Sequence, residues 1–273
     1  MTKLIKTEWL KIKGYSSFWW IMGLTALSYP GINYMFYFIY KDITNQKNTS
    51  GQVFKMALGN PFAFPEAWHS VAYFSSFFVF IPAVVVIMFI SNEYTFRTHR
   101  QNIIDGWSRK QFVTSKLIDV LIVTGLITLL YLAASLVSGF VTKSDGDGNT
   151  WGQAWYTGVF ALQTFAQLSI AFLIGFLVRK AFLALGIFIF YYLILENILV
   201  AFFYVKVNDI GRYLPLEISD RMIPSPAFWG KLRSPEAYQE ALNNIPLHVG
   251  MTLALTTIIW LICYRVNSKR DLK

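Results

Sequence analysis

The sequence predicts an all-α membrane protein with six transmembrane helices, an N-terminal amphipathic helix at the membrane interface and a short cytoplasmic helix between spans 2 and 3. Of its 273 residues, 55% are hydrophobic and only 14% are charged, whereas soluble domains carry about 25% charged residues. Phe, Trp and Tyr make up 18% of the chain and crowd the ends of the apolar runs. That distribution is typical of residues at membrane interfaces.

Six apolar runs of roughly 18–26 residues are each long enough to cross a hydrocarbon core of about 30 Å. They lie at about residues 17–40, 68–90, 117–141, 153–178, 181–205 and 247–264. Lipid offers no hydrogen-bond partners, so each run is expected to be a helix. We expect a single transmembrane domain over residues 1–273. No internal repeat is strong enough to predict an inverted-repeat transporter fold.

Residues 1–16 are expected to form a short helix that ends at Gly14. On a helical wheel of about 100° per residue, four apolar residues fall on one side and four lysines on the other. The two sets are Leu4, Ile5, Trp9 and Ile12, and Lys3, Lys6, Lys11 and Lys13. Such a helix would lie in the interface plane near anionic lipid; the alternative is a basic flank that only sets topology. In the first run, Pro30-Gly31 predicts a kink or a locally unwound turn.

The net charge of +9 could suggest nucleic acid, but the charges cluster in short segments between apolar runs, so we expect membrane lipid and no nucleic acid as a partner. Lys and Arg are concentrated in both termini, in residues 91–116 and at Arg179-Lys180. The positive-inside rule therefore predicts a multi-pass protein of the inner (cytoplasmic) membrane with both termini inside. The loops 41–67, 142–152 and 206–246 should face outward, the last as an ordered cap with a helix over SPEAYQEALNN.

The most densely charged internal segment is residues 91–116, SNEYTFRTHRQNIIDGWSRKQFVTSK, which we call the elbow. Residues 96–104 can form a helix of two to three turns. Gly106 then predicts a stop, since Gly tolerates the left-handed conformation that follows many helices. Ser108 and Gln111 are spaced as a capping box that opens the next helix, which runs directly into the third span.

Trp107, at the turn of the elbow, is a large apolar side chain with nothing in its own segment to cover it. On physical grounds alone, the short helix could be an interfacial helix with its apolar face in lipid. A cytoplasmic elbow that another protein grips is the other interpretation.

The elbow pattern E-Y-T-F-R-T-x-R-Q-N-I-I-D-G-W-S-R-K-Q-F-x-x-S-K resembles the loop between the second and third spans of ABC-2-type transporter permeases. The N-terminal E-W-L-K-I-K resembles the amphipathic entry helix of that family, and the six-span layout with cytoplasmic termini is similar. One departure is visible, because this chain has Thr95-Phe96-Arg97-Thr98 where family members often have Gly-Thr after the acidic dipeptide.

The resemblance implies that the chain is the permease subunit of an ATP-driven exporter and that the elbow is a coupling helix for a separate ATPase subunit. The expected partners are an ABC ATPase dimer and a second permease copy or paralogue. The chain contains no G-x-x-x-x-G-K-[ST] phosphate loop, so it is not expected to be an enzyme or to hold a cofactor; ATP and Mg²⁺ are expected on the ATPase. The expected coupling residues are Glu93, Arg97, Arg100, Asp105, Gly106, Trp107, Ser108 and Arg109.

Polar residues inside the predicted spans are candidates for an ion or substrate path. Glu196, followed by Asn197, is the only carboxylate deep in a span, where an ionisable group is costly; the alternative role is a structural hydrogen bond across the bundle or the dimer interface. Gln163 and Gln167 share one helix face, which favours interhelical hydrogen bonds over a substrate path. With one cysteine and three dispersed histidines, no metal site and no catalytic set is expected.

Two other functions fit parts of the sequence. The chain could be a non-transporting membrane scaffold subunit, or an ion-coupled secondary transporter that uses Glu196. Co-purification with a nucleotide-binding partner that requires the elbow would favour the exporter. Solute flux without any ATPase would favour the secondary transporter.

Overall fold

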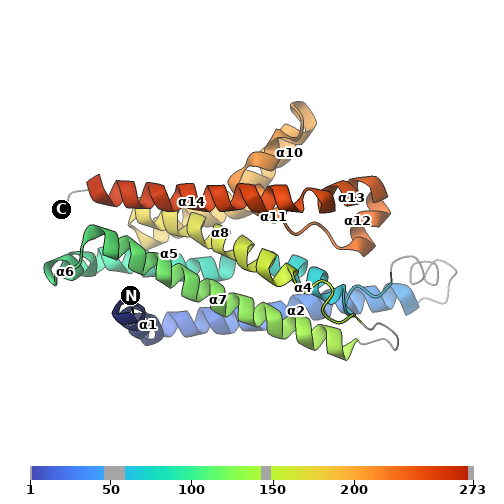
Figure 1. Cartoon of the computed structure of the whole chain (residues 1–273), viewed down its shortest axis with the longest axis horizontal. Coiled ribbons are helices and arrows are strands. Elements are labelled where there is room, and N and C mark those ends of the chain that lie inside the picture. The colour runs from blue at the N-terminus through green and yellow to red at the C-terminus, as the bar shows by residue number, and fades with distance from the viewer. Residues whose placement is uncertain (1, 46–58, 143–148, 270–273) are drawn as a thin grey trace.

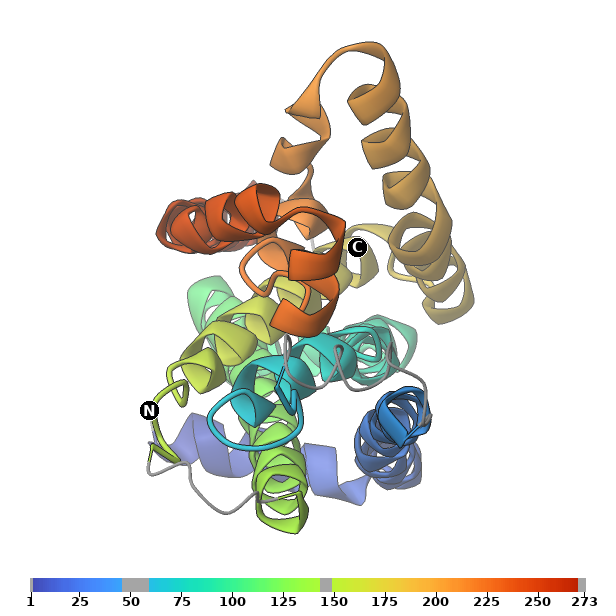
Figure 2. The ribbon, with the colours of Figure 1, turned by 90° about the vertical axis from the view of Figure 1, so that its right-hand side faces the viewer.

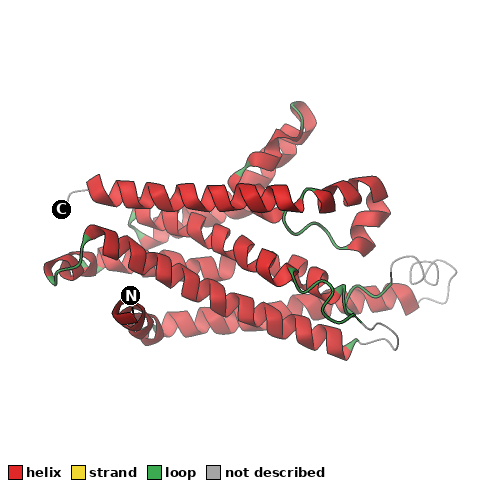
Figure 3. Cartoon of the chain, viewed as in Figure 1, coloured by secondary structure: helices red, strands yellow, loops and turns green. Residues whose placement is uncertain are grey.

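The computed structural model describes residues 2–45, 59–142 and 149–269, and all regular structure in these ranges is helical (Figure 3). Parts of the outward loops expected at 41–67 and 142–152 lie outside the described residues. Most of the long helices run along one axis, and the described part of the chain begins and ends at the end of the bundle that carries α6, Thr98–Ile104 (Figure 1). The prediction of an all-α protein is confirmed.

The chain begins with α1, Thr2–Gly14, and α2, Ser16–Asn45. Helix α1 lies crosswise to the bundle axis (Figures 1 and 2). Helix α2 continues through Pro30 as one helix, so the locally unwound turn expected there is absent. The buried side of α1 is centred on Glu8 and Ile12, whereas Ile5, which was assigned to the apolar side, is exposed.

The second expected span consists of two helices, α4, Ala67–Ser76, and α5, Phe80–Thr95, which are bent by 52°. Three turn residues separate them. Pro82 lies in the first turn of α5, where its missing N–H breaks no intrahelical bond. The second apolar run therefore contains a break between two helices, and its continuous hydrophobicity does not indicate that break.

Helix α7, Arg109–Val141, leads from the elbow along the bundle, and α8, Tyr156–Val178, returns through its centre. Then α9, Ala181–Phe190, the π-helical η1, Tyr191–Leu195, and α10, Glu196–Lys206, form one apolar stretch. Helix α10 projects from the bundle (Figure 2) with exposed apolar side chains such as Ile198 and Phe202.

Residues 209–269 form four short helices and one long one. The short helices are η2, Asp209–Tyr213, α11, Pro215–Asp220, α12, Ala227–Arg233, and α13, Pro235–Asn243. The helix expected over SPEAYQEALNN is confirmed as α13, and its first turn is capped by Ser234. Helix α14, Ile245–Lys269, then returns to the end of the bundle that carries α6 (Figure 1).

Four helical stretches among the described residues are long and apolar enough to cross a membrane, or five if the bent pair α4–α5 counts as one span. They are Arg109–Val141, Tyr156–Val178, Ala181–Lys206 and Ile245–Lys269. The first expected span lies in α2, a 30-residue helix that is not among them. The chain is therefore a multi-pass membrane protein, with α8 as its most buried crossing helix.

Helices α5 and α8 approach closely at Gly175. A Cβ atom on Gly175 would lie 2.7 Å from Cγ2 of Ile90. Gly175→Leu is expected to lower the free energy of unfolding by about 1–3 kcal/mol, because overpacking forces neighbouring side chains out of place. Thermal unfolding of the purified protein in detergent measures the effect.

Gly186 in α9 is the matched control, because a Cβ atom there meets no atom within 4 Å. Gly186→Leu should leave the unfolding temperature unchanged or raise it, since Leu favours helices over Gly. Equal unfolding temperatures for the two variants would contradict the close approach of α5 and α8.

Candidate functional site

The elbow is a helix–turn–helix between α5 and α7, and local sequence fixes each part of it. Helix α6 ends in a Schellman motif, in which the N–H of Trp107 donates to the carbonyl of Asn102 and that of Gly106 donates to Ile103. Gly106 has a φ of 94°, which confirms the predicted stop. Ser108 and Gln111 form the predicted capping box, with reciprocal contacts of 3.2 and 2.7 Å.

The start of α6 differs from the prediction. The expected helix began at Phe96, whereas α6 begins at Thr98 because Arg97 adopts the left-handed conformation with a φ of 56°. This conformation is uncommon for residues other than Gly. It lies where the sequence departs from the Gly-Thr pattern of the resembled family, so Arg97 makes the turn that a glycine would make more easily.

Five charged side chains at the base of the elbow form what we call the charge cluster. Its centre is Lys116 of α7, whose side chain is 3% exposed. The Lys116 ammonium donates to Glu8 of α1 at 2.7 Å, to Glu93 of α5 at 2.9 Å and to Asp119 of α7 at 2.9 Å. An ammonium group has three N–H donors, so each finds a carboxylate.

Lys11 of α1 is the fifth member of the charge cluster. Its ammonium lies 3.2 Å from Glu8 and 3.1 Å from Glu93, and its side chain is partly exposed. The same ammonium lies 5.6 Å from the centre of the Trp107 ring, within reach of a cation–π interaction. Trp107, for which the sequence shows no covering side chain in its own segment, therefore lies close to Lys11 of α1.

Glu93 joins the charge cluster to α6. Its Oε2 accepts a hydrogen bond of 2.6 Å from the hydroxyl of Thr98, while its Oε1 binds both lysines. The backbone carbonyl of Glu93 lies 3.0 Å from Nδ1 of His99. Through this one residue the first turn of α6 is attached to α1, α5 and α7.

The net effect of the two lysines favours the ionised form of Glu8. Burial of the Glu8 carboxylate opposes ionisation, but the charges of Lys116 and Lys11 outweigh it, so the pKa of Glu8 is lowered from 4.5. The carboxylates of the charge cluster outnumber the ammonium groups by one. Removing an ammonium would leave buried carboxylates without compensation, which costs several kcal/mol.

We call the exposed residues of the elbow, such as Phe96 and Ile104, its tip, and the charge cluster its base. Ile104 is 78% exposed and Phe96 67%. Of the predicted coupling residues, Arg97, Asp105, Gly106 and Ser108 are exposed, Arg100, Trp107 and Arg109 are half-buried and Glu93 is buried. The structure thus divides the predicted set into an outward-facing tip and one internal anchor, Glu93.

The start of α7 is tied to the end of α14. A guanidinium nitrogen of Arg109 donates to the carbonyl of Ser268 at 2.8 Å, and the amide of Asn267 donates to the carbonyl of Arg109 at 2.8 Å. Arg179, in the turn between α8 and α9, lies 5.1 Å from the ring of Tyr94 at the end of α5. The elbow, the α8–α9 turn and the C-terminal helix therefore gather at one end of the bundle (Figure 1).

Comparison with known protein families matches residues 4–195 to the family described as ABC-2 family transporter protein. The chain belongs to the ABC-2 transporter family. Its members are membrane components of transporters that work, in general, with ABC ATPase subunits. A search of curated proteins finds no match. In this ABC-2 transporter protein the matched region contains the elbow and the whole charge cluster, whereas α10 to α14 lie outside it.

Three of the four polar residues predicted for an ion or substrate path contact α11 of this ABC-2 protein. The Glu196 carboxylate accepts hydrogen bonds from the backbone N–H groups of Leu216 and Glu217 at 2.7 and 2.8 Å. Those N–H groups belong to the first turn of α11 and have no partner within the helix. A carboxylate at this position also interacts favourably with the helix dipole.

Gln163 and Gln167 of α8 hold the other end of α11. Their amide groups donate to Oδ1 of Asp220 at 2.8 and 2.7 Å, in keeping with the interhelical role that the sequence favours. Asn197 instead donates to the carbonyls of Tyr192 and Leu193 within its own helical stretch. These contacts favour the structural alternative for Glu196.

Sequence reasoning did not identify Glu8, Lys11, Lys116 or Asp119 as a site. A signal was present, because Lys116 and Asp119 are three residues apart at the start of an apolar run. Charges at such a position require partners. Glu8 and Lys11 have the same spacing on α1, but nothing in the sequence shows that the two pairs meet.

Lys116→Met is expected to lower the free energy of unfolding by about 3–5 kcal/mol, because it leaves three carboxylates enclosed without their shared ammonium. Thermal unfolding in detergent measures the loss. Lys110→Met is the control, since Lys110 lies exposed on the same helix. Similar unfolding temperatures for the two variants would show that Lys116 is not the centre of the charge cluster.

The lowered pKa of Glu8 predicts a pH dependence. A carboxylate whose pKa is lower in the folded state contributes stability above its unfolded-state pKa, near 4.5, and loses it as pH falls through the folded pKa. The unfolding temperature should therefore fall as pH decreases below about 4.5, and Glu8→Gln should show a shallower fall. The same slope in both proteins would mean that Glu8 is not paired in the folded state.

Proposed function

We propose that this ABC-2 protein is the membrane-spanning permease subunit of an ATP-driven exporter, and that the elbow receives the conformational work of a separate ATPase subunit. The observation that carries the proposal is the contrast between the two parts of the elbow. Its tip exposes Ile104 and Phe96, while its base is attached to three helices through Glu93 and Lys116. A partner that binds the tip would therefore move α5 and α7 rather than a loose loop.

Hydrogen bonds fix the local structure of the elbow, as the transmission of movement from an ATPase requires. The Schellman motif at Gly106 and the capping box at Ser108 fix the turn between α6 and α7, and the Thr98–Glu93 contact fixes the start of α6. Helix α7 then continues for 33 residues toward the opposite end of the bundle. Displacement of the tip would pass along α7 as a movement of the whole helix.

The orientation that we propose places the elbow in the cytoplasm. The N-terminus, the elbow, the Arg179–Lys180 turn and the C-terminal helix share one end of the bundle (Figure 1), and these segments are rich in Lys and Arg. By the positive-inside rule, that end faces the cytoplasm of a cell whose inner membrane holds the protein. Six spans result when α2 and the bent pair α4–α5 each count as one.

Under this proposal α1 lies in the interface plane. It runs crosswise to the bundle (Figure 2), and its exposed side carries both apolar and basic residues, among them Ile5, Leu10, Lys6 and Lys13. Trp19 and Trp20, at the start of α2, are 55% and 79% exposed and suit the headgroup region. The α1 side that faces inward supplies Glu8 and Lys11 to the charge cluster.

The proposal assigns ATP and Mg²⁺ to the ATPase partner, since the 273 residues contain no phosphate loop. Two permease subunits, either two copies or a copy and a paralogue, would assemble with an ATPase dimer. The largely exposed apolar stretch from α9 to α10 offers a surface for lipid or for the second permease. A secondary transporter is less well supported, because the Glu196 carboxylate already binds α11.

Ile104→Glu tests the coupling role at the tip of the elbow. Ile104 is exposed, so the substitution should not alter folding, but a charge in the docking surface should weaken ATPase association by about tenfold or more, as at interface hot spots. The measurement is co-purification of the nucleotide-binding subunit with the full-length permease, together with ATP-dependent transport.

Ile43→Glu provides the control, because Ile43 is exposed near the far end of α2 (Figure 1). ATPase association and transport equal to wild type in both variants would exclude a coupling role for the tip. Gly106→Pro provides a second test, since proline cannot adopt the φ of 94° found there. It should uncouple ATP hydrolysis from transport while membrane insertion continues.

A further inference from the structure

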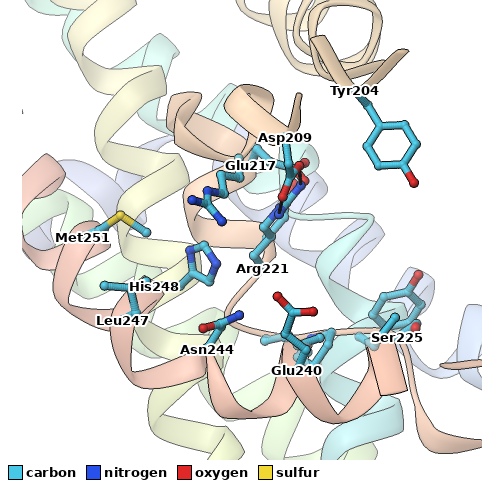
Figure 4. A pocket seen from close by; sticks show the side chains of 17 residues that line it. Tyr204, Asp209, Glu217, Arg221, Ser225, Glu240, Asn244, Leu247, His248 and Met251 are labelled. Atoms are coloured by element: carbon cyan, nitrogen blue, oxygen red, sulfur yellow. Dashed lines mark hydrogen bonds and ion pairs between the residues drawn. The ribbon is translucent and has the colours of Figure 1, made fainter. Parts of the chain in front are cut away.

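A cavity of about 490 Å³ lies between α11 and the α13–α14 corner, toward the end of the bundle opposite α6 (Figures 1 and 4). Tyr73 of α4 and Tyr204 of α10 contribute to its wall. A wider hollow of about 1250 Å³, which extends toward α12, shares both tyrosines. The cavity has the size of a site for a small organic molecule.

The charged side chains that line the cavity are mostly acidic. Among the described side chains, four carboxylates and two guanidinium groups line it: Asp209, Glu217, Asp220 and Glu240, and Arg212 and Arg221. Arg221 is fully engaged, because it binds both carboxylate oxygens of Asp209 at 2.6 Å and Glu217 at 2.7 Å. Each of its three guanidinium nitrogens therefore already binds a carboxylate.

Two of the carboxylates form no ion pair with any described residue. Glu240 forms no ion pair within the described part of the chain, and Figure 4 shows its carboxylate pointing from α13 toward the cavity. Asp220 accepts hydrogen bonds only from neutral amides, those of Gln163 and Gln167. Loss of hydration of the carboxylate, together with the nearby charges of Glu217 and Glu196, raises the pKa of Asp220 to about 7.

A residue in the wall of the cavity also has a buried nitrogen without a partner among the described residues. His248 of α14 is 4% exposed, and its Nδ1 has no hydrogen-bond partner among the described residues. Its ring lines the same cavity as Glu240 (Figure 4). A buried polar atom left unpaired costs about 1–3 kcal/mol, so a polar ligand group that reaches this nitrogen would be favoured.

We propose that this cavity, whose lining includes the side chains of Glu240, Asp220 and His248, binds an amphipathic solute carrying a primary or secondary ammonium group. Its N–H groups donate to acceptors among these side chains, and its apolar part lies against Tyr73 and Tyr204, whose rings also attract cations. The excess of carboxylates disfavours anionic solutes at the same place. This assignment concerns binding alone and does not depend on the role of the elbow.

The test measures the binding of dansylcadaverine, a fluorescent primary amine, to the purified full-length protein in lipid nanodiscs. Its N-acetylated derivative, which has lost the ammonium group, is the matched probe. The amine should bind at least about tenfold more tightly than the neutral derivative, a difference of 1.4 kcal/mol, because only the amine is attracted by the carboxylates of the cavity. Equal affinities, or no saturable binding of the amine, would overturn the proposal.

Glu240→Gln should weaken binding of the amine by about tenfold and leave that of the neutral derivative unchanged. Glu236→Gln is the matched control, because Glu236 lies one turn earlier on α13 and does not line the cavity. Wild-type affinity in Glu240→Gln would overturn the proposal. An equal loss in both variants would also do so, since it would show attraction to the general surface charge.

Discussion

The ammonium group of Lys116 is the contact on which the arrangement at the elbow depends. It is enclosed, and it can be compensated only if carboxylates from α1, α5 and α7 converge on it. That requirement sets where α1 crosses the bundle and where α5 ends. Because Glu93 also binds Thr98, the first turn of α6 is attached to the same contact.

A second set of buried polar contacts organises the opposite end of the bundle. Glu196 and the glutamines of α8 hold the two ends of α11, which forms one wall of the acidic cavity. Between the two ends, α8 packs along α5, α7 and α14, with apolar contacts such as the stacked rings of Phe172 and Trp260. Polar contacts thus fix both ends of a bundle whose middle is apolar.

The sequence predicts the local parts of this structure better than the distant ones. The end of α6 at Gly106 and the capping box at Ser108 depend on residues a few positions apart, so local sequence patterns were sufficient to predict them. The left-handed Arg97 and the break before α5 could not be predicted in this way, because no local sequence pattern marks either of them. The charge cluster depends on Glu8 and Lys116 meeting across 108 positions of sequence, and no local pattern reports that proximity.

The central claim is that movement of α6 reaches the bundle through Glu93. The most direct measurement is the distance between spin labels at Lys110 and Ile43, in a chain whose single cysteine, Cys263, is replaced by Ala and which is assembled with its ATPase. ATP should change this distance in that chain, whereas Thr98→Val, which replaces the hydroxyl bound to Glu93, should bind the ATPase but show a smaller change. An equal ATP-driven change in both chains would contradict the claim.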